Sequence, residues 1–197
     1  MITSTSSSQV KHVVNLQKKA KLRKEEKQFV VEGVKMVSEA PADRLVKVYV
    51  SETFKADNEE FLERMNYDSI GKDVLEIVTD NVFMRMADTQ TPQGIMAVVR
   101  MSDTDLEGIL SDKRNPLLLI IENLQDPGNL GTIVRMAEGA GVTGIIMSSN
   151  TVDIYNPKTI RSTMGSLYRV PVIYVDDICE AADVCTVSYT HLRAHET

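Results

Sequence analysis

The chain contains no tryptophan, few other aromatic residues and only two cysteines among its 197 residues. The scarcity of aromatic side chains argues against a platform on which successive nucleic-acid bases stack. The two cysteines, Cys179 and Cys185, argue against the disulfide framework of a small secreted protein. The histidines His12, His191 and His195 are scattered along the sequence and show no metal-ligand spacing with them, so no metal site is expected.

Long apolar runs are also absent. No segment approaches the length that crosses a bilayer, and the first residues lack the apolar core of a signal peptide. We therefore expect a cytoplasmic protein that does not contact a membrane. Residues 1–8 are rich in Ser and Thr and are expected to be disordered.

The net charge of −6 would by itself argue against a nucleic-acid partner. Basic residues nevertheless crowd one N-terminal segment, where a local patch binds phosphate whatever the total charge. The alternative is an ordinary solvated helix face. The basic residues of this segment are Lys11, Lys18, Lys19, Lys21, Arg23, Lys24 and Lys27.

Strand-like and helix-like segments alternate along the chain, which predicts an α/β fold. Residues 9–101 are expected to form one domain, an α/β/α sandwich, and residues 102–115 a linker with a short helix. Residues 116–186 continue as β-α-β units of a second domain. The expected helices are 9–27, 34–40, 58–65, 80–87, 130–140, 156–164 and 176–184, and the expected strands are 29–31, 45–50, 74–78, 94–101, 116–121, 144–147 and 170–175.

The most informative stretch joins residues 116–121 to the helix that follows. An apolar run typical of a buried parallel strand stops at Asp126-Pro127-Gly128-Asn129, which has strong turn chemistry. A helix with apolar spacing begins at once. Open α/β folds bind ligands at such an elbow, and Arg135 lies close enough along the helix for its side chain to reach back.

A G-x-G-x-x-G pattern at residues 139–144 suggests a different function, dinucleotide binding. That fingerprint must follow a strand and open a helix. Here the glycines close one expected helix and precede a strand, so they are interpreted as helix-end and turn residues.

The elbow residues resemble the first motif of the SpoU/TrmH-type RNA 2′-O-ribose methyltransferases, which belong to the SPOUT superfamily. A second stretch, Asn156-Pro157-Lys158 with residues 161–171, is similar to the second motif of that family. The N-terminal part resembles its L30e-like substrate-binding domain. The residues that match the first motif are Asn123, Asp126, Pro127, Asn129, Gly131 and Arg135.

The resemblance implies an N-terminal L30e-like domain followed by a SPOUT α/β-knot domain, in a homodimer. It implies methyl transfer from S-adenosylmethionine to a ribose 2′-OH of RNA, with rRNA favoured over tRNA and no metal. Arg135 and Asn129 are the expected catalytic residues. A guanidinium stays protonated, so Arg135 would hold phosphate and stabilise alkoxide charge rather than act as a base.

The remaining site residues follow from the same resemblance and from the charge pattern. Tyr174 and Val175, at the end of the strand at 170–175, are expected to contact the cofactor. For Lys158 and Arg161, which share one helix face, an exposed basic face without function is an equal alternative. The expected RNA-binding residues are Lys18, Lys19, Arg23, Lys24, Glu32, Lys158 and Arg161.

The chain departs from the family after residue 186. The third motif, with a Gly/Glu-rich loop, an Ile-Pro-Met segment and a Ser-Leu-Asn-Val helix, is missing. Residues 187–197 resemble a translated sequencing adaptor and are expected to be non-native, although a genuine polar tail is the alternative. We therefore expect this chain to be inactive. A non-catalytic RNA-binding module and a nucleotide-binding α/β protein of another class remain the competing hypotheses.

Overall fold

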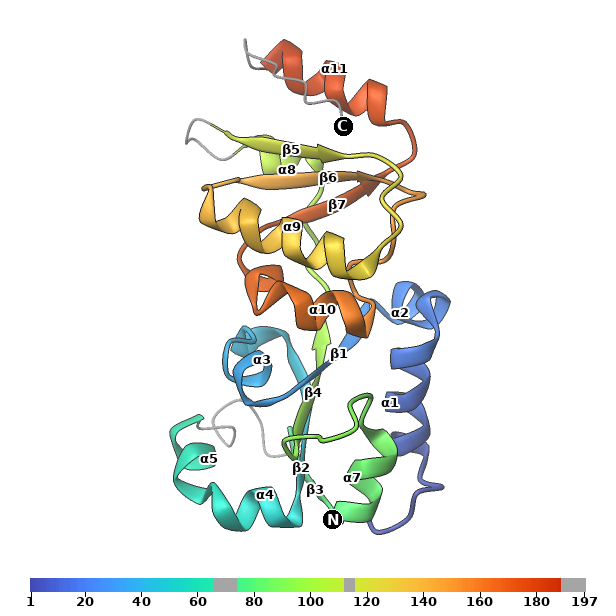
Figure 1. Ribbon diagram of the computed structural model, residues 1–197, viewed down its shortest axis with the longest axis vertical. Coiled ribbons are helices and arrows are strands. Elements are labelled where there is room, and N and C mark those ends of the chain that lie inside the picture. The colour runs from blue at the N-terminus through green and yellow to red at the C-terminus, as the bar shows by residue number, and fades with distance from the viewer. Residues whose placement is uncertain (66–73, 112–115, 189–197) are drawn as a thin grey trace.

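The computed structural model describes residues 1–65, 74–111 and 116–188, which form two α/β parts arranged along the long axis of the molecule (Figure 1). The N-terminal part contains a four-stranded sheet in the order β1-β4-β2-β3. β1 and β2 are antiparallel to β4, and β3 is parallel to β2. The strands are β1 (Gln28–Glu32), β2 (Leu45–Ser51), β3 (Leu75–Val78) and β4 (Ile95–Arg100).

Helices cover both faces of this sheet because its strands bury side chains on alternate sides. Val13 of α1 (Ser8–Lys18) and Phe83 of α7 (Asp80–Met86) pack with Val98 on one face. Met36 of α3 (Val34–Ser38) and Phe54 of α4 (Glu52–Asp57) pack on the other, beside α5 (Glu59–Met65). The expected α/β/α arrangement is confirmed.

The N-terminal segments differ from the sequence-based expectation in two ways. Residues 9–27 form two helices, α1 and α2 (Ala20–Glu26), because the backbone is extended at Lys19. The break lets Arg23 donate hydrogen bonds to the carbonyls of Leu16 and Gln17, which the end of α1 leaves without helical partners. Residues 1–8 were expected to be disordered, but Ile2 pairs with the edge of β3. Its N–H donates to the Ile77 carbonyl at 2.8 Å, and its carbonyl accepts from the Thr79 N–H at 3.1 Å.

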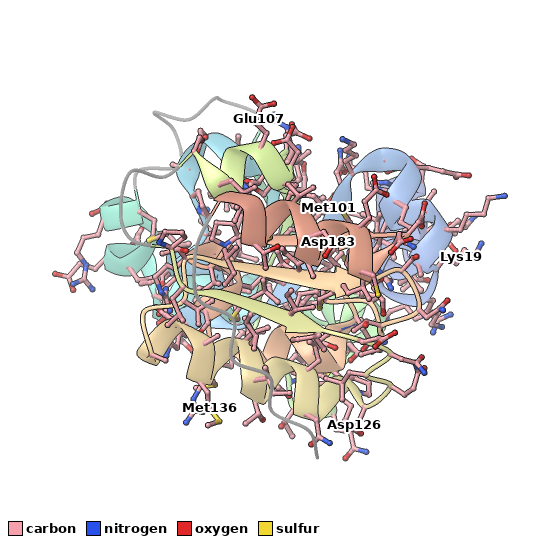
Figure 2. All side chains as sticks on the ribbon, turned by 90° about the horizontal axis from the view of Figure 1, so that it is seen from above. Lys19, Met101, Glu107, Asp126, Met136 and Asp183 are labelled. Atoms are coloured by element: carbon pink, nitrogen blue, oxygen red, sulfur yellow. The ribbon has the colours of Figure 1, made fainter. Side chains whose placement is uncertain are left out.

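The C-terminal part contains a parallel three-stranded sheet in the order β5-β6-β7, formed by Leu118–Ile121, Gly144–Ser148 and Val172–Val175. α9 (Pro127–Gly139) and α10 (Pro157–Thr163) pack on one face. α11 (Ile178–Ser188) packs on the other, and Figure 2 shows α9 and α11 on opposite sides of the strands. The expected α/β fold class is therefore confirmed for this part as well.

The segment expected to be a linker contributes to this second layer. α8 (Leu106–Leu110) places Ile109 against β6, so closely that a Cβ at Gly144 would lie 2.4 Å from its Cγ2. The glycine-rich stretch also has its expected role, since α9 ends at Gly139 and Gly141 has a left-handed φ of 76° before β6 begins.

The two parts share one hydrophobic core. Phe29 of β1 lies against Tyr155, with ring centroids 4.7 Å apart. The Tyr168 hydroxyl, in the short 3-10 helix Ser166–Tyr168, donates a 2.9 Å hydrogen bond to the carbonyl of Met36. α10 therefore lies between the sheet of the C-terminal part and β1 of the N-terminal part (Figure 1).

Candidate functional site

The candidate site is built at the elbow between β5 and α9. The Asp126 carboxylate caps the helix by accepting a 2.6 Å hydrogen bond from the backbone N–H of Asn129. Pro127 occupies the first helical turn, where its missing N–H costs nothing. Asn123 has a φ of 53°, a left-handed conformation that asparagine tolerates better than most residues. The turn chemistry of the sequence thus produces a sharp strand-to-helix turn.

Hydrogen bonds tie this elbow to the end of the next strand. The Gln125 side-chain amide donates to the Asn123 Oδ1 at 2.9 Å and to the Asn150 carbonyl at 2.8 Å. The backbone N–H of Asn123 donates to the Ser148 hydroxyl at 2.9 Å. Gln125 therefore fixes the loops that follow β5 and β6 relative to each other.

The end of β7 joins the same edge of the sheet. Ser149 donates through its backbone N–H to the Val175 carbonyl at 2.9 Å and through its hydroxyl to Asp176 Oδ1 at 2.8 Å. The three carboxyl ends of the parallel strands thus form one polar edge, where open α/β sheets bind their ligands.

Tyr174 is held away from that edge by other hydrogen bonds. Its hydroxyl donates to the Val152 carbonyl at 2.8 Å and accepts from the Ile154 N–H at 2.7 Å. Burial raises the pKa of the Tyr174 phenol above its usual value. The phenol is therefore a structural group, and the side chain of Val175 packs against the cluster that contains Ile173.

Asn129 and Arg135, the two expected catalytic residues, are both exposed on α9. Within the described residues, neither side chain forms a hydrogen bond or an ion pair, so both are free to contact a substrate. Six residues of α-helix separate them by about 9 Å along the axis. A long arginine side chain is needed to cover that distance.

Gly131 lets α10 approach this part of α9. A Cβ at position 131 would lie 2.4 Å from the Ser162 Cβ and 2.7 Å from the Thr159 carbonyl oxygen. The close contact brings the two helix starts together, so that the Lys158 ammonium lies 4.0 Å from the Asp126 carboxylate. Lys158 remains largely exposed beside the elbow.

Arg161 and Glu32 connect the two parts of the protein. The Arg161 guanidinium binds the carboxylate of Asp88 at 2.5 Å. Glu32 accepts hydrogen bonds from the Asp88 N–H, at 2.9 Å, and from the Thr89 hydroxyl. Both residues therefore hold the loop at residues 88–89, and either would have to give up these contacts to bind RNA directly.

Arg23 does not belong to an RNA-binding surface in this structure, which corrects the expectation from the basic segment. It is 3% exposed, and its guanidinium donates to Asp153 at 2.6 and 3.0 Å besides capping α1. By contrast, Lys18, Lys19 and Lys24 are exposed, and Figure 2 shows Lys19 projecting away from the body of the molecule. The Lys24 ammonium lies 6.0 Å from the centroid of the Tyr174 ring, so this segment combines one buried structural arginine with exposed lysines.

A second cluster of charged residues, at the junction of the two parts, was not predicted. Arg169 binds Glu39 at 2.6 Å and Glu138 through a bidentate contact, and Ser166 also donates to Glu138. The hydrogen bond from Arg169 is the main reason why the pKa of Glu138 lies below its usual value. Arg169 and Glu39 are far apart in sequence, so no local pattern identifies them as partners.

Over the described residues, no group of three His, Cys, Asp or Glu side chains is placed to hold a metal ion. None of the helices in the described ranges is long and apolar enough to cross a bilayer.

Two family models match the chain, one on each part. Residues 7–97 match the MRM3-like substrate binding domain, and residues 116–196 match the SpoU rRNA Methylase family. The two matches leave residues 98–115 uncovered, and the second match extends over residues 187–196.

Comparison with individual proteins also finds rRNA methyltransferases. The human mitochondrial rRNA methyltransferase 3 is 32% identical over 170 residues, which cover 82% of this chain and 38% of that protein. The 23S rRNA (guanosine(2553)-2′-O)-methyltransferase RlmP of Bacillus subtilis is 35% identical over 108 residues, covering 52% of this chain and 41% of that protein. The chain therefore spans about two fifths of the length of these relatives.

A solved structure shares the fold across both parts. The AdoMet-bound rRNA methyltransferase of Sinorhizobium meliloti superposes with a TM-score of 0.75 at 24% identity, covering 92% of this chain and 67% of that one. The likeness includes the relative placement of the two α/β parts.

Proposed function

Because the chain belongs to the SpoU family of rRNA methylases, we propose that it transfers a methyl group from S-adenosylmethionine to a ribose 2′-OH of RNA. The observation that carries this proposal is the geometry of the elbow, where the motif residues build a strand-to-helix turn beside Arg135, which has no partner among the described residues. The names of the human and Bacillus relatives favour rRNA over tRNA as the substrate.

The polar sheet edge fits the chemistry of the cofactor. The Val175 carbonyl already accepts from Ser149, but the Ser149 hydroxyl keeps lone pairs that could accept a hydrogen bond from a ribose hydroxyl or the amine of an adenosine. The carboxylate of Asp176, which accepts from Ser149 at this edge, would supply negative charge to a cationic cofactor bound there. When bound, the cofactor supplies an electrophilic methyl group and leaves as a neutral thioether, so the reaction needs no metal.

The residues of α9 and α10 would align the RNA. Arg135 would pair with the phosphate beside the target ribose and stabilise negative charge as the 2′-OH loses its proton to water. The Asn129 amide would hydrogen-bond the ribose and fix its orientation. Lys158 would contact a neighbouring phosphate, since only a 4.0 Å ion pair with Asp126 restrains it.

A methyl-transfer assay tests this function. The complete product of the reading frame that encodes these residues is incubated with RNA and labelled S-adenosylmethionine. The label should appear in dinucleotides that resist alkaline hydrolysis, because 2′-O-methylation blocks cleavage at that position. Label confined to alkali-sensitive nucleotides would contradict the proposal.

The Arg135→Ala variant separates catalysis from RNA binding. We expect a loss of transfer of about 100-fold or more, as for other groups that stabilise developing oxyanions, with RNA affinity nearly unchanged. Arg64→Ala, another exposed helical arginine, is the matched control and should retain full activity. Equal activities of the two variants would remove Arg135 from the site.

The chain of 197 residues has none of the third-motif segments, and we propose that it does not catalyse transfer by itself. Turnover by this purified chain would contradict that proposal directly. The second candidate function is a non-catalytic RNA-binding module, favoured by the exposed Lys18, Lys19 and Lys24.

Charge reversal tests the RNA-binding surface whether the protein is a methyltransferase or a non-catalytic RNA-binding module. A Lys18→Glu/Lys19→Glu variant should bind RNA more weakly, and the slope of log affinity against log salt should fall by about 2 if both lysines contact phosphate. An unchanged salt slope would place the RNA elsewhere.

Three further properties belong to the same proposal. A homodimer and a knotted backbone are typical of the family that the motifs resemble, and light scattering would measure the oligomeric state. A cytoplasmic location is proposed as well, although the name of the human relative places that protein in mitochondria.

A further inference from the structure

A cavity of about 330 Å³ lies in the N-terminal part, between the starts of α4 and α7 and the loop that precedes β4. Figure 1 shows α4 and α7 at the end of this part that faces away from β5, β6 and β7. The cavity is thus separate from the candidate methyl-transfer site. At roughly 30 Å³ per water, it has the volume of about ten waters, enough for a planar heterocycle.

Both apolar and polar side chains line the cavity. Its buried lining includes Phe54, Phe83 and Ser51, whereas Met84 is 54% exposed and the polar residues of the rim are exposed as well. Gly94 has a φ of 86° and lies so close that a Cβ there would be 2.7 Å from the Phe54 Cβ. The apolar part of this lining suits the face of a planar ring.

Asp80 provides a charged acceptor at the rim. Its two carboxylate oxygens accept from the Thr53 hydroxyl at 2.7 Å and from the Thr53 N–H at 3.3 Å. Each oxygen keeps further acceptor capacity because a carboxylate has about four lone-pair positions. Hydrogen bonds from Thr53 and Ser51 lower the pKa of Asp80, which keeps it ionised at neutral pH.

Gln93 adds a donor to the same rim. Its Oε1 accepts a 2.8 Å hydrogen bond from the Val34 N–H, which fixes the orientation of the amide. Its Nε2 has no protein partner among the residues that the structure describes. No lysine or arginine lines the cavity, whereas Asp57 adds a second carboxylate, so a phosphate group would be repelled.

We propose that this cavity binds the guanine base of an unpaired nucleotide in the RNA, remote from the methylated ribose. Guanine presents two adjacent donors, N1–H and the N2 amine, to a carboxylate such as Asp80, and its O6 accepts from an amide such as Gln93. Unpaired bases are the usual targets of sequence-specific RNA recognition. The inference rests on the proposed RNA substrate and adds a nucleotide preference to it.

Substitutions in the RNA test the inference without altering the protein. Fluorescence anisotropy would compare fluorescein-labelled UUUGUUU with oligonucleotides that carry inosine or adenosine at the centre, using the chain as it stands. Inosine lacks the N2 amine, and one hydrogen bond to a charged acceptor corresponds to about tenfold in affinity. We expect the guanosine oligonucleotide to bind most tightly, inosine about tenfold more weakly, and adenosine no better than inosine.

Protein variants assign the preference to the cavity. Asp80→Asn should bind guanosine and inosine oligonucleotides alike, while Asp183→Asn, the same charge change on α11 (Figure 2), should keep the wild-type preference. Gln93→Glu should weaken guanosine binding through repulsion of O6. Circular dichroism melts would show that each variant is folded.

Several results would overturn the inference. Equal affinities of the wild type for the three oligonucleotides would reject the cavity as a guanine site but leave RNA binding intact. Failure to bind these oligonucleotides and total RNA alike would reject the proposed function as well. Spermidine binding that is lost in Asp80→Asn, without any base preference, would identify a cation site instead.

Discussion

Gly131→Ala tests whether the first motif needs glycine for helix packing. The added Cβ would lie 2.4 Å from the Ser162 Cβ and 2.7 Å from the Thr159 carbonyl oxygen. The second atom belongs to the backbone, so α9 and α10 must move apart. Overpacking of this kind lowers the free energy of unfolding by about 3 kcal/mol at the upper end of its usual range. The better helix propensity of alanine raises it by about 1 kcal/mol. The net destabilisation is therefore about 2 kcal/mol.

Gly139→Ala is a matched control on the same helix. A Cβ at position 139 meets no heavy atom within 4 Å, so only the gain in helix propensity, up to about 1 kcal/mol, applies. In a chain of this size 1 kcal/mol shifts the melting temperature by about 2–4 °C. We expect Gly131→Ala to melt about 6 °C below the wild type and Gly139→Ala at or slightly above it. Equal melting temperatures for the Gly131→Ala and Gly139→Ala variants would refute the packing argument.

The remaining predictions concern the junction between the two parts. Arg23→Met leaves the half-buried Asp153 carboxylate without its partner and should destabilise the fold by about 3–5 kcal/mol in urea titrations, whereas Arg23→Met/Asp153→Leu should recover much of that loss. Arg169→Ala should be less stable than the wild type at neutral pH, and the difference should vanish in acid. The pKa of Glu138 is lowered on folding, so its contribution to stability is complete above the unfolded pKa of about 4.3 and is lost as the pH falls through the lower folded value.

Melting curves from pH 3 to pH 8 would measure the second effect, with Arg64→Ala as the control. Arg64 is exposed on α5 and donates to the carbonyl of Glu60, so its removal should have the same small effect at every pH. A difference between Arg169→Ala and the wild type that does not change below pH 4 would contradict the assignment to Glu138. For the Arg23 pair, a double variant no more stable than Arg23→Met would show that packing, rather than the buried charge, causes the loss.

Local patterns predicted the elements well, because each depends on neighbours in sequence. The apolar run at residues 116–121 and the turn chemistry of Asp126-Pro127 are enough to specify the strand and the elbow. Helix α4 was missed because its residues, Glu52–Asp57, have few apolar positions and begin directly after β2. The break at Lys19 was missed because residues 9–27 contain no proline or glycine that would mark it, although it is this break that lets Arg23 bond to the end of α1.

Residue roles were harder to predict than elements. A lysine and an arginine in one basic segment contribute the same positive charge to the sequence pattern. In the structure, however, Lys19 is exposed and Arg23 is buried against a carboxylate 130 residues away. The cavity beside Asp80 was not predicted either, since its walls come from three separate segments. What decides these roles is the three-dimensional arrangement of segments, which periodicity and spacing do not encode.

The arrangement of the two parts also limits how RNA can reach the elbow. Arg161 of α10 binds Asp88, and Asp88 with Thr89 is held by Glu32 of the N-terminal sheet. α10 also packs against α9, whose first turn contains Asn129. A continuous set of contacts therefore runs from the N-terminal part to the candidate catalytic helix. Under the proposed function, RNA held by the N-terminal part would meet the elbow in a fixed geometry, and substitutions at Arg161 in the complete protein should change the position of the methylated nucleotide more than the affinity for RNA.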